Sequence, residues 1–413
     1  MFLKLRIIFV FVVFIFLSFL IGLTTYKSMV LEESILKNHK YIINKLSQII
    51  PNIFLLLKGE GINNLFIPLK NTYREDKFKV NGLYPYLTSN GWVILDINDS
   101  GESIIDVSWE KIKKLYSAHC ESCIGSSFAA VPYNPIKVQN NLVFHLGGVL
   151  FKYNLKSKVF SAFKGNYHHS IEVFQDSLLY LCAYGKDTLE ELGGIINDKI
   201  VLLNINTGNV LYEKQIPNLL LKNNMSSLLL GTNNFNSNTN VADLIHVNDI
   251  QPVNKNTNFA KVGDLFLSFK HLSTVVLYRP SSDSVLWCSI GPYLNQHDVD
   301  IIDMDKIGIY NNNNIKDGLY LKNNYSNIII FDFKTKKYSK IHEIIFRKLK
   351  IRSDWGSRFE VLDNGDFFFE DSPNGMYYLI SKNGNLISSK NFPFDNVKST
   401  TTSWARPYTS KKF

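Results

Sequence analysis

Past residue 80 the chain alternates apolar and polar residues in short runs that end at turn residues. Residues 85–88 and 92–96 form the first two runs, and Asn90-Gly91 lies between them. This arrangement predicts two antiparallel strands joined by a tight turn. Residues 204–211, 278–287 and 331–338 repeat it around polar turns. The pattern predicts an all-β domain over residues 80–413, with almost no helical periodicity.

Histidine precedes a short alternating run in three separate parts of this domain. The three segments begin at His168-His169, at His246 and at His297. A fourth, at Ser357-Arg358, keeps the strand and the turn but carries arginine in place of histidine. Because equivalent positions in a radially repeated fold face a common axis, residues from distant segments are expected to converge on one pocket.

The spacing of these segments favours a β-propeller. The domain divides into about five or six units of roughly 40 to 60 residues, the range of four-stranded blades. We predict six blades. A β-sandwich or double jelly roll also has alternating strands and turns, but neither accounts for histidines that recur at strand starts.

The amino-terminal residues predict a membrane segment. Lys4 and Arg6 precede an uncharged run over residues 7–24, which is long enough as a helix to cross the hydrocarbon. The basic end favours the cytoplasm, so the domain is expected to face the periplasm or the cell exterior, anchored in the inner membrane. Residues 25–29 lack a convincing cleavage pattern, which favours an uncleaved anchor over residues 1–29 rather than a signal peptide.

Residues 30–79 are predicted to connect this anchor to the domain. Apolar residues recur among Lys, Asn and Glu up to about residue 57, with the spacing of an amphipathic helix. This helix is expected to serve as a stalk, and a solvated spacer is the alternative.

Net charge and cysteine content limit the kinds of ligand, disulfide and metal site that the chain is expected to have. The net charge of +9 is spread along the chain, so it implies a modest attraction to anionic substrates or membrane surfaces, and no nucleic-acid partner is expected. Cys120 and Cys123 are the pair closest in sequence, and a local disulfide is plausible in an exported domain. A single Cys-x-x-Cys supplies only two metal ligands, so no metal site is predicted.

An ordered set of motifs resembles the bacterial arylsulfate sulfotransferase family. The set comprises His246-Val247-Asn248, Ser268-Phe269-Lys270, Trp287 ahead of the turn at Gly291, and Gln296-His297-Asp298. The similarity covers roughly residues 80 to 390. It implies a propeller enzyme that moves a sulfuryl group from an aryl sulfate to a phenolic acceptor through a sulfohistidine. No nucleotide sulfate donor and no cofactor are implied.

The same resemblance implies roles for individual residues. His297 would be the nucleophile, with Asp298 or a backbone carbonyl fixing its tautomer. His246 and one of His168 and His169 would bind sulfate oxygens or protonate the leaving phenolate. Lys270 stands where the family has arginine, so it keeps the positive charge and loses the two-pronged donor geometry.

Strand alternation and the lack of a motif separate the remaining histidines and Trp287 from the candidate site residues. Strand alternation predicts that His168 and His169 face opposite sides and that His271 points away from Lys270. His119, His145 and Trp287 are expected to be structural.

Two other functions are alternatives to a sulfotransferase. A non-catalytic propeller that binds an anionic ligand or a protein partner is the main alternative, and a quinone-dependent dehydrogenase on a propeller is a weaker one.

Overall fold

The computed structural model describes residues 66–119, 131–189, 194–230, 243–315, 320, 324–395 and 398–409. They belong to one compact unit, Leu65–Phe413. The predicted membrane segment, the predicted stalk helix and the Cys120-Cys123 pair lie outside these residues. Within the described ranges, no helix is long and apolar enough to span a membrane.

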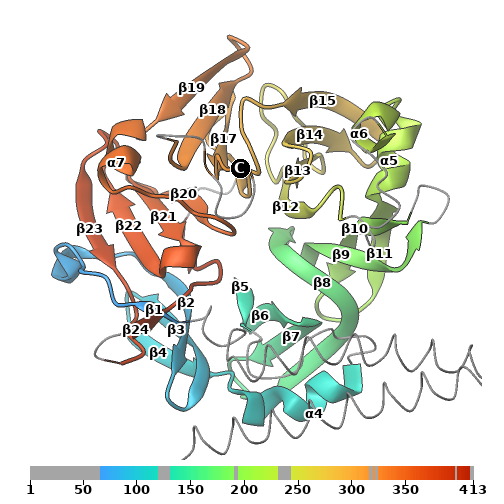
Figure 1. Cartoon of the computed structure of the whole chain (residues 1–413). Coiled ribbons are helices and arrows are strands. Elements are labelled where there is room, and N and C mark those ends of the chain that lie inside the picture. The colour runs from blue at the N-terminus through green and yellow to red at the C-terminus, as the bar shows by residue number, and fades with distance from the viewer. Residues whose placement is uncertain are drawn as a thin grey trace, which may run out of the picture. The chain divides into compact units, whose positions relative to one another are not determined.

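Antiparallel sheets follow one another around this unit, as in a β-propeller (Figure 1). Four of these sheets have four strands each, and the strands of each sheet pair in chain order, apart from one strand that arrives from the C-terminal end. The first contains β12 (Val247–Pro252), β13 (Leu265–Phe269), β14 (Thr274–Arg279) and β15 (Ser284–Ile290). The second contains β16 (Val299–Ile301), β17 (Lys306–Asn311), β18 (Asn327–Asp332) and β19 (Lys337–Ile341). The third contains β20 (Arg358–Val361), β21 (Phe367–Asp371), β22 (Met376–Ile380) and β23 (Leu386–Lys390).

The fourth sheet joins both ends of the unit. It contains β2 (Gly82–Thr88), β3 (Gly91–Asn98) and β4 (Gly101–Asp106), and β25 (Arg406–Pro407) pairs with β2. A short pair, β1 (Phe66–Pro68) with β24 (Lys398–Thr400), adds a second link between the two ends. The ring is therefore closed by strands from opposite ends of the sequence.

The remaining sheet has seven strands, β5 to β11 in order. They are β5 (Tyr133–Val138), β6 (Asn141–Leu146), β7 (Gly148–Asn154), β8 (Phe160–Phe174), β9 (Leu178–Leu189), β10 (Ile195–Asn204) and β11 (Val210–Gln215). The first half of β8 pairs with β7 and the second half with β9. The register shifts between His168 and Ile171, so a bulge separates the two halves.

The predicted turns are found where the polar residues placed them. Hairpins join β2 to β3, β10 to β11, β14 to β15 and β18 to β19, which confirms the strand and turn assignments at all four positions. Middle strands such as β6 and β13 are buried on both faces, because neighbouring sheets cover them. Outer strands such as β15 are only partly buried.

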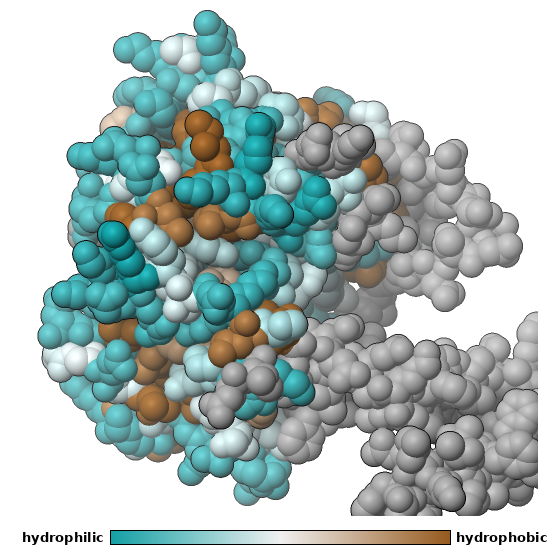
Figure 2. All heavy atoms as spheres, turned by 60° about the vertical axis from the view of Figure 1, so that its left-hand side comes forward, coloured by the Kyte–Doolittle hydropathy of each residue, from teal (hydrophilic) through white to brown (hydrophobic). Residues whose placement is uncertain are grey.

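Four α-helices occur among the described residues, and they were not predicted. They are α4 (Trp109–His119), α5 (Ile216–Lys222), α6 (Ser226–Leu230) and α7 (Glu343–Lys348). In α4, Ile112 and Tyr116 are four residues apart and both buried, so one face of the helix packs on the sheets. The face of the molecule that includes the left-hand side of Figure 1 is mostly hydrophilic, with apolar residues in scattered patches (Figure 2).

Buried carboxylates connect consecutive sheets. Asp249 of β12 accepts the Val299 N–H of β16 at 2.9 Å, and Asp298 accepts the Phe359 N–H of β20 at 3.0 Å. Glu370 of β21 accepts the backbone N–H groups of Trp404 and Ala405, just ahead of β25. The starts of β16, β20 and β25 are thereby hydrogen-bonded to an acidic side chain of the preceding sheet.

Candidate active site

Three of the predicted site histidines lie together. His169 is central, with ring centroids 4.8 Å from His246 and 6.2 Å from His297. These residues come from β8, from the residue before β12 and from the segment before β16, in three different sheets. Tyr133 and Trp404 complete the surroundings, with ring centroids 6.1 Å and 6.4 Å from His169.

A left-handed backbone conformation places several of these side chains. His169 and His246 have φ of 50° and 53°, and Ser357 and Trp404, at the starts of two other inner strands, have φ of 72° and 60°. Positive φ is uncommon for residues other than glycine. Because it recurs just before or within the inner strand of several sheets, it is a regular feature of this fold rather than an isolated strained residue. At His169, His246 and Trp404 it interrupts the strand alternation, and the rings of His246 and Trp404 both contact His169.

The predicted opposition of His168 and His169 is wrong for this reason. Their Nδ1 atoms are 2.9 Å apart, because the bulge and the left-handed residue interrupt the alternation. His168 stacks on Tyr184 with a centroid distance of 3.9 Å, and its Nε2 lies 3.5 Å from Asp198. His169 is thus the member of the pair that reaches the cluster.

His297 is buried with both ring nitrogens engaged. Nδ1–H donates to Asn312 Oδ1 at 2.8 Å, and Nε2 accepts the Gly356 N–H at 3.0 Å. Asn312 therefore fixes the tautomer, and the expectation that Asp298 or a backbone carbonyl does so is wrong. Asp298 instead accepts from the backbone of β20. Attack by Nε2 requires the contact with Gly356 to break.

Two imidazoles of the cluster, those of His297 and His169, are held in the neutral form. Burial, followed by the positive charge of Lys270, holds the pKa of His297 well below its usual range. Burial and the neighbouring His246 lower the pKa of His169 in the same way. A neutral imidazole keeps a lone pair on one nitrogen, which is the form that can act as a nucleophile at pH ~7.

Lys270 lies beside the cluster, directly after β13. Its side chain is buried, and its backbone N–H donates to the His246 carbonyl at 3.1 Å. His271 is more exposed and lies next to His246, with ring centroids 4.5 Å apart. The alternation argument does not apply to this pair, because Lys270 and His271 are in the turn after β13.

Two residues expected to be structural differ in their relation to the cluster. His145 is buried, stacks on Tyr133, and its Nε2 bonds the His169 carbonyl at 3.1 Å. Burial lowers the pKa of His145 to about 3, so it supports His169 as a neutral group. Trp287 packs among Phe266, Phe331 and Phe333, as predicted.

The sequence predicted that Arg358, at the fourth strand start, takes the position that histidine has in the other three segments. In the structure the equivalent residue is one position earlier. Ser357, rather than Arg358, has the left-handed conformation at the strand entrance. Arg358 is buried, 3.9 Å from Asp298 and 3.4 Å from Glu360. Its positive charge therefore balances these two carboxylates rather than contributing to the histidine cluster. Burial raises the pKa of Asp298 to about 6 and of Glu360 to about 7, although Arg358 opposes both shifts.

Asn312, Gly356, Tyr133 and Trp404 were not found from the sequence. Asn312 belongs to a run of four asparagines, which indicates only a turn. Tyr133 and Trp404 lie 271 residues apart, so only the closure of the ring places them beside the same histidine. No local spacing could have indicated this.

Fold and site together define a β-propeller-like protein with a cluster of histidines where its inner strands begin. The sequence model of the arylsulfotransferase (ASST) family matches residues 149–392, which is more than half of the chain. The chain therefore belongs to the arylsulfotransferase family. Membership indicates an arylsulfotransferase-like enzyme whose substrates are small aryl sulfates and phenols.

Other comparisons concern the fold alone. No curated protein matches the chain. Solved structures similar to it include the WD40 β-propeller domain of Doa1, at 12% identity over 84% of this chain and 97% of that one, with a TM-score of 0.41. Hydrazine synthase of Kuenenia stuttgartiensis has 10% identity over 74% and 78%, with a TM-score of 0.42. A streptogramin B lyase has 10% identity over 79% and 88%, with a TM-score of 0.40.

Proposed function

We propose that this protein transfers a sulfuryl group from an aryl sulfate to a phenol through a sulfohistidine, without a nucleotide sulfate donor. The observation that carries the proposal is the convergence of His169, His246 and His297 from three sheets. Several convergent groups are what such a reaction needs: a nucleophile, a proton donor and charge to balance sulfate.

His297 is the proposed nucleophile. In the first step its Nε2 lone pair forms a bond to sulfur while the bond from sulfur to the aryl oxygen breaks. The leaving oxygen takes the bonding electrons and a proton from His246, whose other ring nitrogen is hydrogen-bonded to Asp243. In the second step the acceptor phenol returns a proton to that histidine, its oxygen attacks sulfur, and the N–S bond breaks with its electrons returning to Nε2.

Neighbouring groups suit the charges that develop. Asn312 holds the proton on Nδ1, which leaves the lone pair on Nε2. The Gly356 N–H now bonds Nε2, and once sulfur takes its place this amide lies beside the sulfuryl oxygens. Lys270 supplies positive charge close to His297. It can balance sulfate as a point charge, without the paired hydrogen bonds of an arginine.

Trapping the intermediate tests the assignment. The full chain in detergent would be mixed with a chromogenic aryl sulfate, quenched in base and digested, and the sulfated peptide mapped by mass spectrometry. We expect the label on His297. His169 is the competing nucleophile, because it is less buried and its Nε2 has no hydrogen-bond partner within the described residues. Label on His169 would overturn the assignment, and His119→Ala serves as the unaffected control.

A non-catalytic, anion-binding propeller is the second candidate. It is favoured by one observation: His297 is 1% exposed and both its ring nitrogens are hydrogen-bonded. Lys270→Arg separates the two functions, because arginine restores two-pronged binding of sulfate oxygens. An enzyme should gain rate, by about tenfold for one added charged hydrogen bond. A binding module would show no turnover before or after the change.

We also propose that the propeller has six blades. In this interpretation β8 is the outer strand of one blade through its pairing with β7 and the inner strand of the next through its pairing with β9. A separate apolar core containing Val143 and Leu150 of one half and Leu181 and Val201 of the other supports this division. Five further cores lie between successive sheets.

The proposed location is outside the cytoplasmic membrane, with residues 1–29 as an anchor. It is supported by the apolar run over residues 7–24 and by the basic residues before it. Protease added to intact spheroplasts tests it. Digestion of the propeller is the expected result, and protection until the membrane is lysed would contradict the proposed location.

A further inference from the structure

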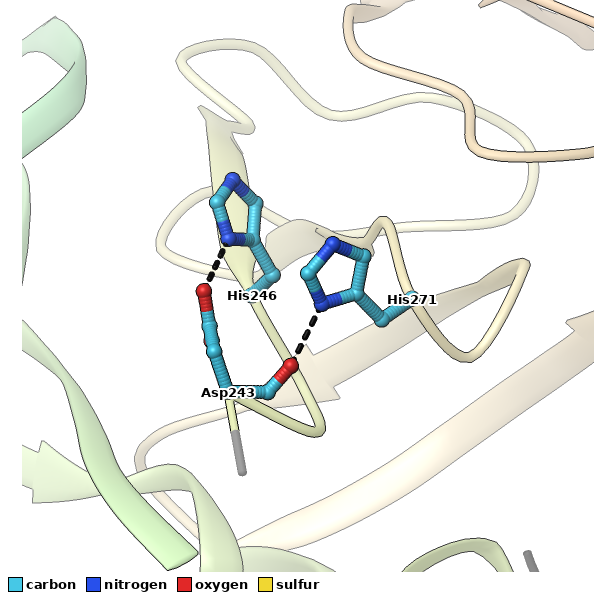
Figure 3. A group of neighbouring side chains, drawn as sticks. All are labelled: Asp243, His246 and His271. Atoms are coloured by element: carbon cyan, nitrogen blue, oxygen red, sulfur yellow. Dashed lines mark hydrogen bonds and ion pairs between the residues drawn. The ribbon is translucent and has the colours of Figure 1, made fainter. Parts of the chain in front are cut away.

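Asp243, His246 and His271 form a cluster at the edge of the histidine site (Figure 3). Each offers one ligand atom, and these atoms all lie within 4.8 Å of one another. The Nδ1–H of His246 donates to Asp243 Oδ2, and that of His271 donates to the Asp243 carbonyl, both at 2.5 Å. Two imidazoles therefore point the same nitrogen at one residue, and Figure 3 shows their other nitrogens pointing away from it.

We propose that Asp243, His246 and His271 bind a divalent transition metal of the Zn²⁺ class. Two imidazole nitrogens and a carboxylate oxygen are a donor set that suits zinc, with a further position left for water or a substrate oxygen. The metal would take the place of the two Nδ1 protons that now lie between nitrogen and oxygen, and each neutral ring would carry its proton on Nε2 instead. The Asp243 carbonyl lies close enough to be a fourth donor.

The backbone around the cluster is firmly held. The Lys270 N–H donates to the His246 carbonyl at 3.1 Å, and the His271 N–H donates to the Ile245 carbonyl at 3.3 Å. These bonds fix the two segments that carry the histidines relative to each other. Coordination needs separations of about 3 Å between ligand atoms, so the contacts at 2.5 Å must open slightly and the wider ones must close. The partly exposed side chains of Asp243 and His271 have room for this change and give an ion access.

Sequence spacing gave no indication of this site. Asp243 and His246 are three residues apart ahead of β12, whereas His271 arrives from the turn between β13 and β14. Pairing of β12 with β13 brings them together. The site shares His246 with the proposed active site, and one part of its interpretation rests on the proposed function. Coordination through Nδ1 leaves the ring proton on Nε2, so a metal-bound His246 can donate a hydrogen bond but can no longer exchange tautomers.

Metal affinity tests the site independently of catalysis. The full chain in detergent would compete with a chromophoric chelator for Zn²⁺. We expect one tight site, weakened at least tenfold in His271→Ala and in Asp243→Ala and unchanged in the control His119→Ala. Equal affinity in wild type and His271→Ala would overturn the proposal. Mg²⁺, which prefers oxygen ligands, is expected not to compete.

Activity provides the second measurement. Zn²⁺ should lower the rate of sulfuryl transfer in the wild type and leave His271→Ala unaffected, since His271 has no part in the proposed transfer. Equal inhibition of both would overturn the link between the metal and His246. If no aryl sulfate is turned over in the absence of metal, the proposed function fails while the chelator experiment still decides the metal site.

Discussion

At the scale of single residues, the tautomer of His297 depends on Asn312. The amide oxygen accepts from Nδ1–H, while the amide nitrogen donates to the Ser353 and Gly356 carbonyls. One side chain therefore orients the ring and holds the loop whose N–H contacts Nε2. The motif around His297 was enough to select it as the candidate nucleophile. The sequence could not predict that its hydrogen-bond acceptor is Asn312, fifteen positions further along in a run of asparagines.

Replacing Asn312 with leucine should impair the chemical step more than binding. Without the amide oxygen the ring can carry its proton on Nε2, which removes the nucleophile. We expect kcat to fall by about 10- to 100-fold with KM little changed, in the range of losses from misplaced catalytic groups. Asn312→Asp keeps an acceptor for Nδ1–H and should lose less. Equal losses in both variants would show that Asn312 acts only through the loop.

The rate should also show an unusual dependence on pH. Because the pKa values of His297 and His169 are held well below 6.5, both rings stay neutral as the pH falls through 6.5. An ordinary imidazole nucleophile would lose activity with a midpoint near pH ~6.5. We expect kcat/KM to show no such loss between pH 7.5 and 6, measured with a chromogenic donor. A fall centred on 6.5 would mean that the nucleophile has an unperturbed pKa.

At the scale of elements, the sequence predicts hairpins well and strand starts less well. Polar turns occur where the alternation stops, so the hairpin of β14 and β15 follows from local chemistry. The bulge in β8 does not, because it depends on two sheets pairing with one strand. The helix α4 was missed as well, since Ile112 and Tyr116 are the only buried residues among its eleven.

Loss of the carboxylate between β12 and β16 should destabilise the protein. Asp249→Ala leaves the buried Val299 N–H without an acceptor, at a cost of about 1–3 kcal/mol. Burial raises the pKa of Asp249 well above its usual range, so the group resembles a neutral amide, and Asp249→Asn should recover most of the stability. Thermal melting of both variants measures this. The exposed Glu102→Ala is the control, and equal melting of wild type and Asp249→Ala would contradict the assignment.

At the scale of the whole molecule, closure depends on a short segment near the C-terminal end. β25 completes the sheet of β2, and Arg406 donates to Asn134, to the Ile171 carbonyl and to Glu172. The repeat pattern could predict a ring from the sequence. It could not predict which strand closes the ring, because β25 is two residues long and has no periodicity.

Truncation should separate closure from the rest of the fold. A chain that stops after Thr402 loses Trp404, Arg406 and the hydrogen bonds to Glu370, so the sheet of β2 to β4 has no inner strand. We expect rapid proteolysis of its first and last sheets, whereas a chain that stops after Thr409 should resist protease like the wild type. If both truncated chains resist equally, β25 is not what closes the ring.

Trp404 lies both on this closing segment and beside His169. A nascent chain therefore has no complete histidine site while it is being synthesised, even after every histidine of the cluster has emerged. The site is assembled only when the last dozen described residues arrive. Catalytic activity would thus report on completed synthesis. Two separately expressed fragments that associate through the pairing of β25 with β2 would regain activity only when they bind each other, so activity would measure their association.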